Sequence, residues 1–482
     1  MDQDGEIAGG DLRRTQRATL LVSIVTNFVN PFAGTALTVA VPVIGSEFHS
    51  SATALSWIVS AYMFCTVSLS VPFGRIADIR GRRRVLVTGI VVFAAMTYLA
   101  TLAHSMAAFI AFRVLMGIGS AMIFATNIPI LISVYPVRMR GKVLGVSVAA
   151  VYIGLACGPV IGGIVTQTYG WRTVLVLISV VAFAAFLVAF IWLPKEPGAG
   201  EGGESSVGAG GGAAGAGDKK KLSPGSIALY IASMLLFMYG FTTFAQDALS
   251  YFILAAGIVV FVFYVRHESR TGAPIVEMRV FRGNLNFLLS NLAALFNYAA
   301  TFAVGYLLSL YLQLVRGWSA DQTGIILICQ PLVQTVVSPF AGRLSDRKSP
   351  YMLASFGMGC CAAALLSFIL VGGDTPVWRI VAGLAVVGFG FGVFSSPNAN
   401  AIMSSVEPRD FGVASSIQST ARSLGQVIGM ALITISTNFI IGKTPIDETP
   451  KESIVRTTHV SFIVFAALCA VGVFISLNQK RD

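Results

Sequence analysis

The chain is divided into long apolar stretches separated by short polar segments. Most stretches are about 18–28 residues long, the length that a helix needs to cross a hydrocarbon core of about 30 Å. Of the 482 residues, 55% are hydrophobic and only 11% are charged, whereas a soluble domain carries about a quarter charged residues. The stretches do not show the roughly ten-residue alternation of a membrane β-barrel. The sequence therefore predicts an all-α polytopic membrane protein.

We expect fourteen transmembrane helices: six, then an inserted pair, then six more. Their approximate ranges are 18–44, 54–74, 85–103, 106–134, 143–168, 173–194, 225–245, 249–265, 285–313, 321–341, 351–372, 378–404, 412–440 and 459–478. The expected segments are a tail at 1–17, an N-terminal six-helix bundle at 18–194, a linker at 195–222, the inserted pair at 223–267, a C-terminal six-helix bundle at 268–478 and a tail at 479–482. Half of residues 198–217 are glycines, which is typical of a flexible linker.

The positive charges gather on alternate loops. With the N-terminus inside, most of the 33 Lys and Arg residues fall on the cytoplasmic side, as the positive-inside rule requires. We therefore expect a plasma-membrane protein with both termini in the cytoplasm. This bias explains the net charge of +11, so the charge does not indicate a nucleic-acid partner. The first apolar stretch is too long for the core of a cleavable signal peptide, and we expect it to remain as an anchor.

A basic sequence motif occurs twice in the chain. The first copy, GRIADIRGRRR, begins at Gly74, and the shorter second copy, GRLSDRK, begins at Gly342. The glycine and aspartate of the first copy return 268 positions later in the second. Three glycines of helix five return 271 positions later in helix thirteen: Gly141, Gly154 and Gly158 match Gly412, Gly425 and Gly429. The matches predict two equivalent halves, a construction that many secondary transporters use.

The motifs resemble those of the major facilitator superfamily, specifically its fourteen-helix drug:proton antiporter branch. GRIADIRGRRR is similar to the superfamily's loop between helices two and three. FRVLMGIGSA (Phe112–Ala121) is similar to the arginine-bearing motif of helix four, GLACGPVIGG (Gly154–Gly163) to the antiporter Gly-Pro motif, and STARSLGQVIG (Ser419–Gly429) to a further stretch of the branch. The resemblance runs from about residue 17 to 478. It implies two six-helix bundles that enclose a central cavity and rock about it.

The doubled loop is the candidate gate. Glycines there permit close approach and a tight turn, and an aspartate can pair with arginines or accept from helix N-terminal amides. The candidate gating residues are Gly74, Asp78, Arg80, Gly81, Arg82 and Arg83 in the first copy and Gly342, Asp346 and Arg347 in the second. We expect a latch between the two halves. The alternative is a solvated basic loop that serves topology alone.

The Gly-Pro motif places Gly154, Gly158, Gly162 and Gly163 on what we expect to be one helix face, where a neighbouring backbone can pack closely. Pro159 removes a backbone donor and favours a kink. The resemblance implies a role in conformational change. The alternative is close helix packing without a mechanistic role.

Arg113 lies about 11 Å inside helix four, and Ser120 and Asn127 follow on the same face. A charge at that depth is expensive unless it faces a cavity or a partner. The resemblance implies a role in coupling. The alternative is a structural hydrogen bond to the backbone of a kinked helix.

Arg422 lies about 15 Å inside helix thirteen and forms a polar stripe with Gln418 and Gln426. We expect this stripe to line the cavity; the alternative is a purely structural contact between helices. The remaining candidates for lining the substrate site are Asn27, Asn30, Asn291, Tyr298, Gln330, Gln334 and Asn398. Each of them could equally hold neighbouring helices together.

The acidic residues depart from the family pattern. The branch usually carries an aspartate in helix one, and the corresponding position here is Ala33. All 22 acidic residues, and the four histidines, can be placed in loops, tails or helix ends. Proton coupling usually needs a group that titrates inside the cavity. The resemblance therefore supports export better than proton coupling, and the two arginines favour anionic or neutral substrates.

We expect a secondary transporter that exports small amphipathic, drug-like compounds by alternating access, with proton coupling left open. The alternatives are an organic-anion or metabolite exporter without proton coupling and a membrane sensor that does not transport. No nucleophile–His–acid set, metal-spaced cluster or phosphate loop is visible, so we expect no enzyme, cofactor or metal. The expected partners are a small-molecule substrate and the lipid bilayer, and the expected state is a monomer.

Overall fold

The computed structural model describes residues 3–193, 224–243, 248–268, 284–345, 347–407, 411–442, 444–445 and 448–479. The expected 195–222 linker and Asp346 of the second gating loop lie outside this set. The side chain of Asp78 in the first gating loop also lies outside it. The latch that these two aspartates were expected to form therefore stays a prediction.

The described part of the chain is almost entirely helical. The helices are α1 (Gln3–Glu47), α2 (Ala52–Arg80), α3 (Arg82–Ala100), α4 (Met106–Val134), α5 (Val137–Tyr169), α6 (Trp171–Trp192), α7 (Pro224–Thr242), α8 (Ala248–Glu268), α9 (Leu285–Phe302), α10 (Val304–Leu310), the π-helical turn η2 (Tyr311–Val315), α11 (Ala320–Leu327), α12 (Cys329–Ser345), α13 (Pro350–Phe368), α14 (Val377–Ser404), α15 (Phe411–Ile440) and α16 (Lys451–Leu477). The predicted all-α membrane fold is confirmed.

Thirteen of the described stretches are long and apolar enough to cross a membrane, and a shorter apolar helix lies at Gly225–Phe241. Together they match the fourteen expected spans. Two spans are broken: α9, α10 and η2 share one, and α11 and α12 share another. Pro331 explains the second break, because its ring has no N–H and clashes with the carbonyl four residues earlier, at the last residue of α11.

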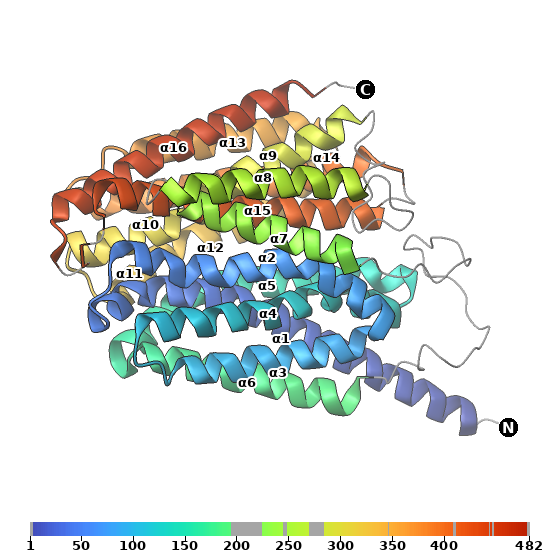
Figure 1. The fold of residues 1–482 in the computed structure, drawn as a ribbon. Helices are drawn as coiled ribbons and strands as arrows, with labels where there is room; N and C mark the ends of the chain where they lie inside the picture. Colours follow the sequence, from blue (N-terminus) through green and yellow to red (C-terminus); the bar gives the residue numbers. More distant parts are fainter. Residues whose placement is uncertain are drawn as a thin grey trace.

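The helices form two bundles that lie side by side in Figure 1. We call α1–α6 the N-half and α9–α16 the C-half. Both ends of the described chain lie at the same end of the molecule, which we call the terminal end (Figure 1).

The glycine repeats show that the halves pack alike. A Cβ on Gly154 of α5 would overlap the carbonyl oxygen of Phe28 in α1. The matching Gly425 of α15 approaches the carbonyl oxygen of Leu295 in α9 in the same way. Each half therefore buries the first helix of its bundle against a glycine-lined face.

The first gating loop is shorter than the sequence suggested. Helix α2 continues through Arg80, and α3 begins at Arg82, so a single residue makes the turn. That residue is Gly81, with a φ of 97°, a backbone conformation that favours glycine. The basic residues of the motif therefore lie mostly on two helix ends, where helical geometry fixes their spacing.

The inserted pair lies across the boundary between the halves, with α7 against α2 and α15 (Figure 1). Met234 and Met238 of α7 share an apolar cluster with Phe64 of α2 and Val427 of α15. Helix α8 packs on α7 and exposes much of its apolar surface, as a lipid-facing helix does. The pair is thus at the edge of the molecule but contacts both halves.

The two halves meet tightly at the end opposite the termini, which we call the sealed end. A Cβ on Gly163 of α5 would overlap the carbonyl oxygen of Ala320 in α11, and a Cβ on Gly324 of α11 would overlap the carbonyl oxygen of Pro159 in α5. The backbones of α5 and α11 are therefore in direct contact, with no room for a side chain between them.

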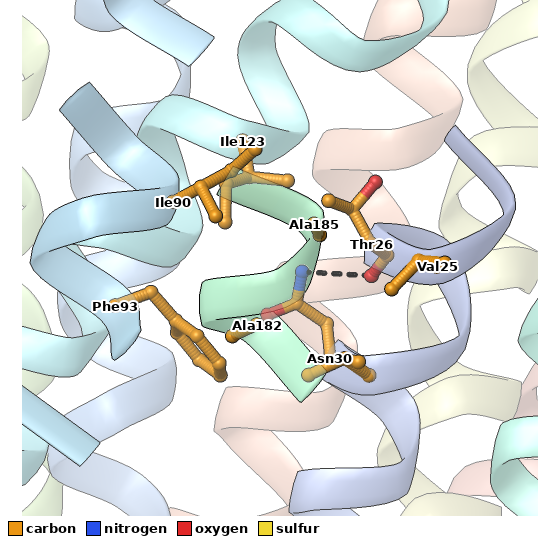
Figure 2. Close-up of a pocket in the computed structure, with 9 residues that line it drawn as sticks. Val25, Thr26, Asn30, Ile90, Phe93, Ile123, Ala182 and Ala185 are labelled. Carbon is orange, nitrogen blue, oxygen red and sulfur yellow. Dashed lines mark hydrogen bonds between the residues drawn. The ribbon is translucent and has the colours of Figure 1, made fainter. Parts of the chain in front are cut away.

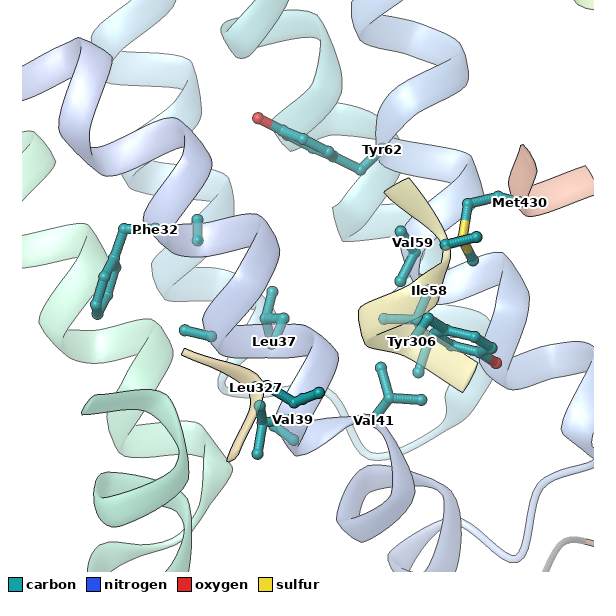
Figure 3. Close-up of a cluster of buried hydrophobic side chains, with 14 of the residues drawn as sticks. Phe32, Leu37, Val39, Val41, Ile58, Val59, Tyr62, Tyr306, Leu327 and Met430 are labelled. Carbon is teal, nitrogen blue, oxygen red and sulfur yellow. The ribbon is translucent and has the colours of Figure 1, made fainter. Parts of the chain in front are cut away.

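Hydrogen bonds and apolar contacts complete the sealed end. Ser309 donates to the carbonyl of Thr38 at 3.0 Å, and Gln313 donates to the carbonyl of Val39 at 2.9 Å. Thr434 donates to the Ser56 hydroxyl at 2.7 Å. Figure 3 shows Leu327, Tyr306 and Met430 of the C-half in one apolar cluster with residues of α1 and α2.

Candidate functional site

Arg113 does not reach an open space. It is 1% exposed, its Nε donates to the carbonyl of Ile58 at 2.8 Å, and its guanidinium lies 4.5 Å from the ring centre of Tyr62. A carbonyl dipole and an aromatic face thus compensate the buried charge. This geometry fits the alternative drawn from the sequence, a structural hydrogen bond to the backbone of a kinked helix; the acceptor carbonyl lies in α2, which contains Pro72.

The Tyr62 hydroxyl extends this contact into a polar network inside the N-half. It lies 2.7 Å from the Ser120 hydroxyl and 3.0 Å from Oδ1 of Asn30, and Ser120 also donates to that oxygen at 3.2 Å. Asn127 donates to Asn27 at 2.8 Å. The expected substrate-lining asparagines of α1 therefore bind other side chains of the same half.

Beside this network is a small internal void of about 10 Å³, roughly the room that one water needs. Figure 2 shows Asn30 at its edge, bonded to Thr26, with Phe93 and Ala182 on the other side. The void lies within the N-half, between α1, α3, α4 and α6. It is too small to hold a substrate.

In the C-half, most of the expected lining residues are also buried. Asn291 is 5% exposed and donates to the carbonyl of Phe287 in its own helix. Gln334 and Asn398 are buried, and Gln330 is half-buried. These residues lie on helices of the C-half, and their role in lining a substrate site stays a prediction.

Arg422 is different, because its side chain is exposed although it lies well inside α15. Its guanidinium lies 5.9 Å from the ring centre of Tyr298 in α9 and donates to the Ser419 hydroxyl at 3.2 Å. Both partners are uncharged. Gln418 and Gln426, one turn to either side, are half-buried, so the expected polar stripe exists along this face.

The position of Arg422 around its helix shows where it faces. Gly425 and Gly429 of α15 pack on α9, and Thr434 bonds to α2 of the other half. At 100° per residue, Arg422 falls between these two contact faces, so it faces the boundary between the halves.

Two apolar side chains of α4 are exposed in the part of the helix nearer the terminal end. The face that buries Arg113 and Ser120 next carries Phe124, four residues further along, which is 48% exposed. Ile128, one turn on, is also 48% exposed. The halves are in contact at the sealed end, and the exposed Arg422 lies at their boundary, nearer the terminal end than Thr434.

The glycines of the Gly-Pro motif do not share one face, contrary to the prediction. Gly154, Gly158 and Gly162 pack on α1 within the N-half, whereas Gly163 faces α11 of the C-half. The reason is helical spacing. Residues 154, 158 and 162 are four apart and form one row along the helix, whereas Pro159 and Gly163 form the adjacent row. One row holds the N-half together and the other makes the seal.

The gating residues have varied surroundings. Arg83 donates to the carbonyl of Phe190 at 2.7 Å, which ties α3 to α6. Gly342 lies close to Ser396, whereas the nearest atom to a Cβ on Gly74 would be Ala125 Cβ at 4.0 Å. The close approach expected at both glycines therefore occurs at Gly342.

Sequence reasoning missed several polar residues because threonine, serine and tyrosine are common in apolar helices. Tyr62 bonds to the N-half network, and Ser309 and Gln313 bond across the seal. Asn297 is fully buried beside the Cys361 thiol and is 267 positions after Asn30. This spacing is close to the 268- and 271-residue repeats and could have identified Asn297.

Among the described residues, no group of three or more His, Cys, Asp or Glu side chains could hold a metal.

Comparison with known proteins identifies the fold and the family. The family model described as Major Facilitator Superfamily matches residues 24–430 and 290–479. The riboflavin transporter RibZ of Clostridioides difficile is 24% identical over 96% of this chain and 97% of its own. The multidrug efflux pump LfrA of Mycolicibacterium smegmatis is 27% identical over 84% of this chain and 78% of its own.

A solved structure shares the fold. The crystal structure of a bacterial homologue of the human lysosomal transporter Spinster, in an inward-facing and unoccupied conformation, matches with a TM-score of 0.66. The alignment covers 97% of this chain and 99% of the other, at 17% sequence identity. With paired bundles, matching motifs and these relatives, the chain belongs to the Major Facilitator Superfamily of membrane transporters.

Proposed function

We propose that the protein exports small amphipathic compounds across the plasma membrane by alternating access. The observation that carries the proposal is the pairing of a sealed end, where α5 and α11 touch backbone to backbone, with an exposed Arg422 side chain at the boundary between the halves nearer the terminal end. With both termini in the cytoplasm, as the charge bias predicts, this is a state closed to the outside and open to the inside. Such a state takes substrate from the cytoplasm.

The relatives support a role in export of this kind. They include a multidrug efflux pump, a riboflavin transporter and the methylenomycin A resistance protein of Streptomyces coelicolor. The Tyr298 ring beside the polar stripe of α15 suits a molecule with both an aromatic and a polar part. Arginines lie well inside the described helices, but no carboxylate lies in the middle of one.

The second candidate is an organic-anion or metabolite exporter without proton coupling. Arg422 favours it, because an exposed guanidinium with uncharged neighbours attracts an anion. The two candidates differ in their response to a pH gradient. A proton antiporter would move substrate against its gradient when a pH gradient is imposed, and an uncoupled exporter would not.

Flux through reconstituted protein tests the proposal. Liposomes with and without the protein would be loaded with riboflavin or methyl viologen, and release would be followed with and without a pH gradient. Protein-dependent release of at least one of the two compounds is expected, with the uncharged riboflavin favoured over the dication methyl viologen because of the positive charge of Arg422. A Gly324→Val variant is the control, because a large side chain between α5 and α11 should prevent closure and block the cycle. If neither these compounds nor an anionic aromatic is moved, a sensor that binds without transport becomes the better description.

A further inference from the structure

The two arginines inside the membrane helices differ in what they can meet. The Ile58 carbonyl and the Tyr62 ring that hold Arg113 both belong to the N-half, so a rigid movement of the halves carries these partners with it. Arg422 lies at the boundary between the halves, and its side chain is exposed. Its contacts in the described structure are the Ser419 hydroxyl and the Tyr298 ring. Arg422 is therefore a fixed positive charge that the cycle can present to either side.

The neighbourhood of Arg422 suits an aromatic anion. A guanidinium can form two parallel hydrogen bonds with a sulfonate or a carboxylate. The Tyr298 ring packs edge-on against Phe391 at 5.1 Å, so aromatic surface lies beside the charge. Aromatic rings of a ligand stack favourably on such surfaces.

Building on the proposed export function, we propose that Arg422 binds aromatic monoanions and that the membrane potential drives their export. The empty carrier holds one positive charge at the site, and the loaded carrier is neutral there. A negative interior therefore returns the empty site to the inside, whereas the loaded step does not sense the field. One negative charge leaves per cycle, and no proton is exchanged.

The potential alone is a sufficient driving force. Moving one charge through 100 mV corresponds to about a 50-fold concentration ratio at equilibrium. An export cycle of this kind needs no titrating group in the cavity. It therefore accounts for a membrane interior in which the sequence places arginines but no clearly mid-membrane carboxylate.

The binding step can be tested with purified protein and matched probes. Naphthalene-1-sulfonate and 1-naphthyltrimethylammonium share a ring system and differ in charge, and equilibrium dialysis measures their affinities. The sulfonate should bind more tightly than the cation, and Arg422→Gln should weaken its binding by about ten- to a hundredfold, as expected for a lost charge-assisted hydrogen bond. Arg422→Lys should keep part of the preference, and Arg456→Gln, an exposed arginine on α16, should leave it unchanged. Equal binding of the two probes would overturn the proposal.

The driving force can be tested in vesicles of pure phosphatidylcholine, so that no anionic lipid head competes for the site. A potassium gradient with valinomycin makes the interior positive by about 100 mV at equal pH on both sides. Naphthalene-1-sulfonate should accumulate inside toward about 50-fold, and Arg422→Gln should abolish the accumulation. Accumulation that follows a pH gradient but not the potential would refute this inference and leave the export function standing. If no probe, riboflavin or methyl viologen is moved, the export function itself fails.

Discussion

The contact between α5 and α11 makes the sharpest prediction. In Gly324→Ala, the new Cβ would lie closer to the carbonyl oxygen of Pro159 than the 3.0 Å that real Cβ atoms respect. The obstacle is backbone, so no side chain can rotate away, and the two helices must separate. Overpacking of this kind costs about 1–3 kcal/mol. Because the cost falls only on the sealed state, the balance between sealed and open states should shift about 5- to 150-fold.

Distances between spin labels across the sealed end would measure the shift. Leu102 and Leu370 are exposed, at 56% and 67%, and lie in different halves, so labels there report separation. After replacement of the native cysteines, Gly324→Ala should add a longer-distance population. Gly305→Ala is the matched control in the same half, because nothing lies within 4 Å of its added Cβ.

A second control separates the seal from general instability. Gly158→Ala crowds Thr35 within the N-half, so it should lower the melting temperature without favouring the longer distance. An unchanged distance distribution in Gly324→Ala would refute the reasoning. A shift of equal size in Gly158→Ala would refute it too, since the effect would not belong to the boundary between the halves.

Three further predictions concern polar contacts. Tyr62→Phe removes a buried hydroxyl from the N-half network and should cost about 1 kcal/mol of stability in thermal unfolding, whereas Tyr169→Phe, at a 77% exposed position, should cost nothing measurable. Glu47→Gln weakens the ion pair between Glu47 and Arg172, whose side chains are 41% and 38% exposed respectively. Because the pair is partly solvated, the loss of unfolding free energy should stay within about 1 kcal/mol and should shrink in high salt. A larger loss that does not depend on salt would contradict this reasoning. Asp78→Asn tests the latch: spin labels at the terminal end should show a population change of about tenfold, and unchanged populations would favour a solvated loop.

The number and order of the spans could be predicted because hydropathy depends on local sequence alone. The similar packing of the two halves could also be predicted, because glycines at matched spacings in apolar helices mainly allow neighbouring backbones to approach closely. The turn at Gly81 was harder to place. Charged residues after Gly74 resemble a loop, but a helix can continue past the membrane surface wherever its charged side chains reach water, as α2 does to Arg80.

The distinction between the two arginines could not be predicted. Both lie deep in apolar stretches, and their sequence contexts give the same expectation of a cavity or a partner. The two arginines differ in the part of the structure that lies against each side chain. Arg113 donates a hydrogen bond to a carbonyl of α2 in its own half, whereas Arg422 faces the boundary between the halves. The split of the Gly-Pro motif has the same origin, because only the packing of a second half shows that Gly163 has a different neighbour from Gly162.

The composition of the seal has a consequence for the energetics of the proposed cycle. The α5–α11 crossing is made by Gly163, Ala320, Gly324 and Pro159, and burying these residue types freezes no side-chain rotamers. Long side chains at the same crossing would lose about 1–2 kcal/mol each in conformational entropy on every closure and regain it on every opening. A contact made by backbone and very small side chains avoids this repeated loss and gain of conformational entropy. It can close tightly and still part without a large entropic difference between its two states.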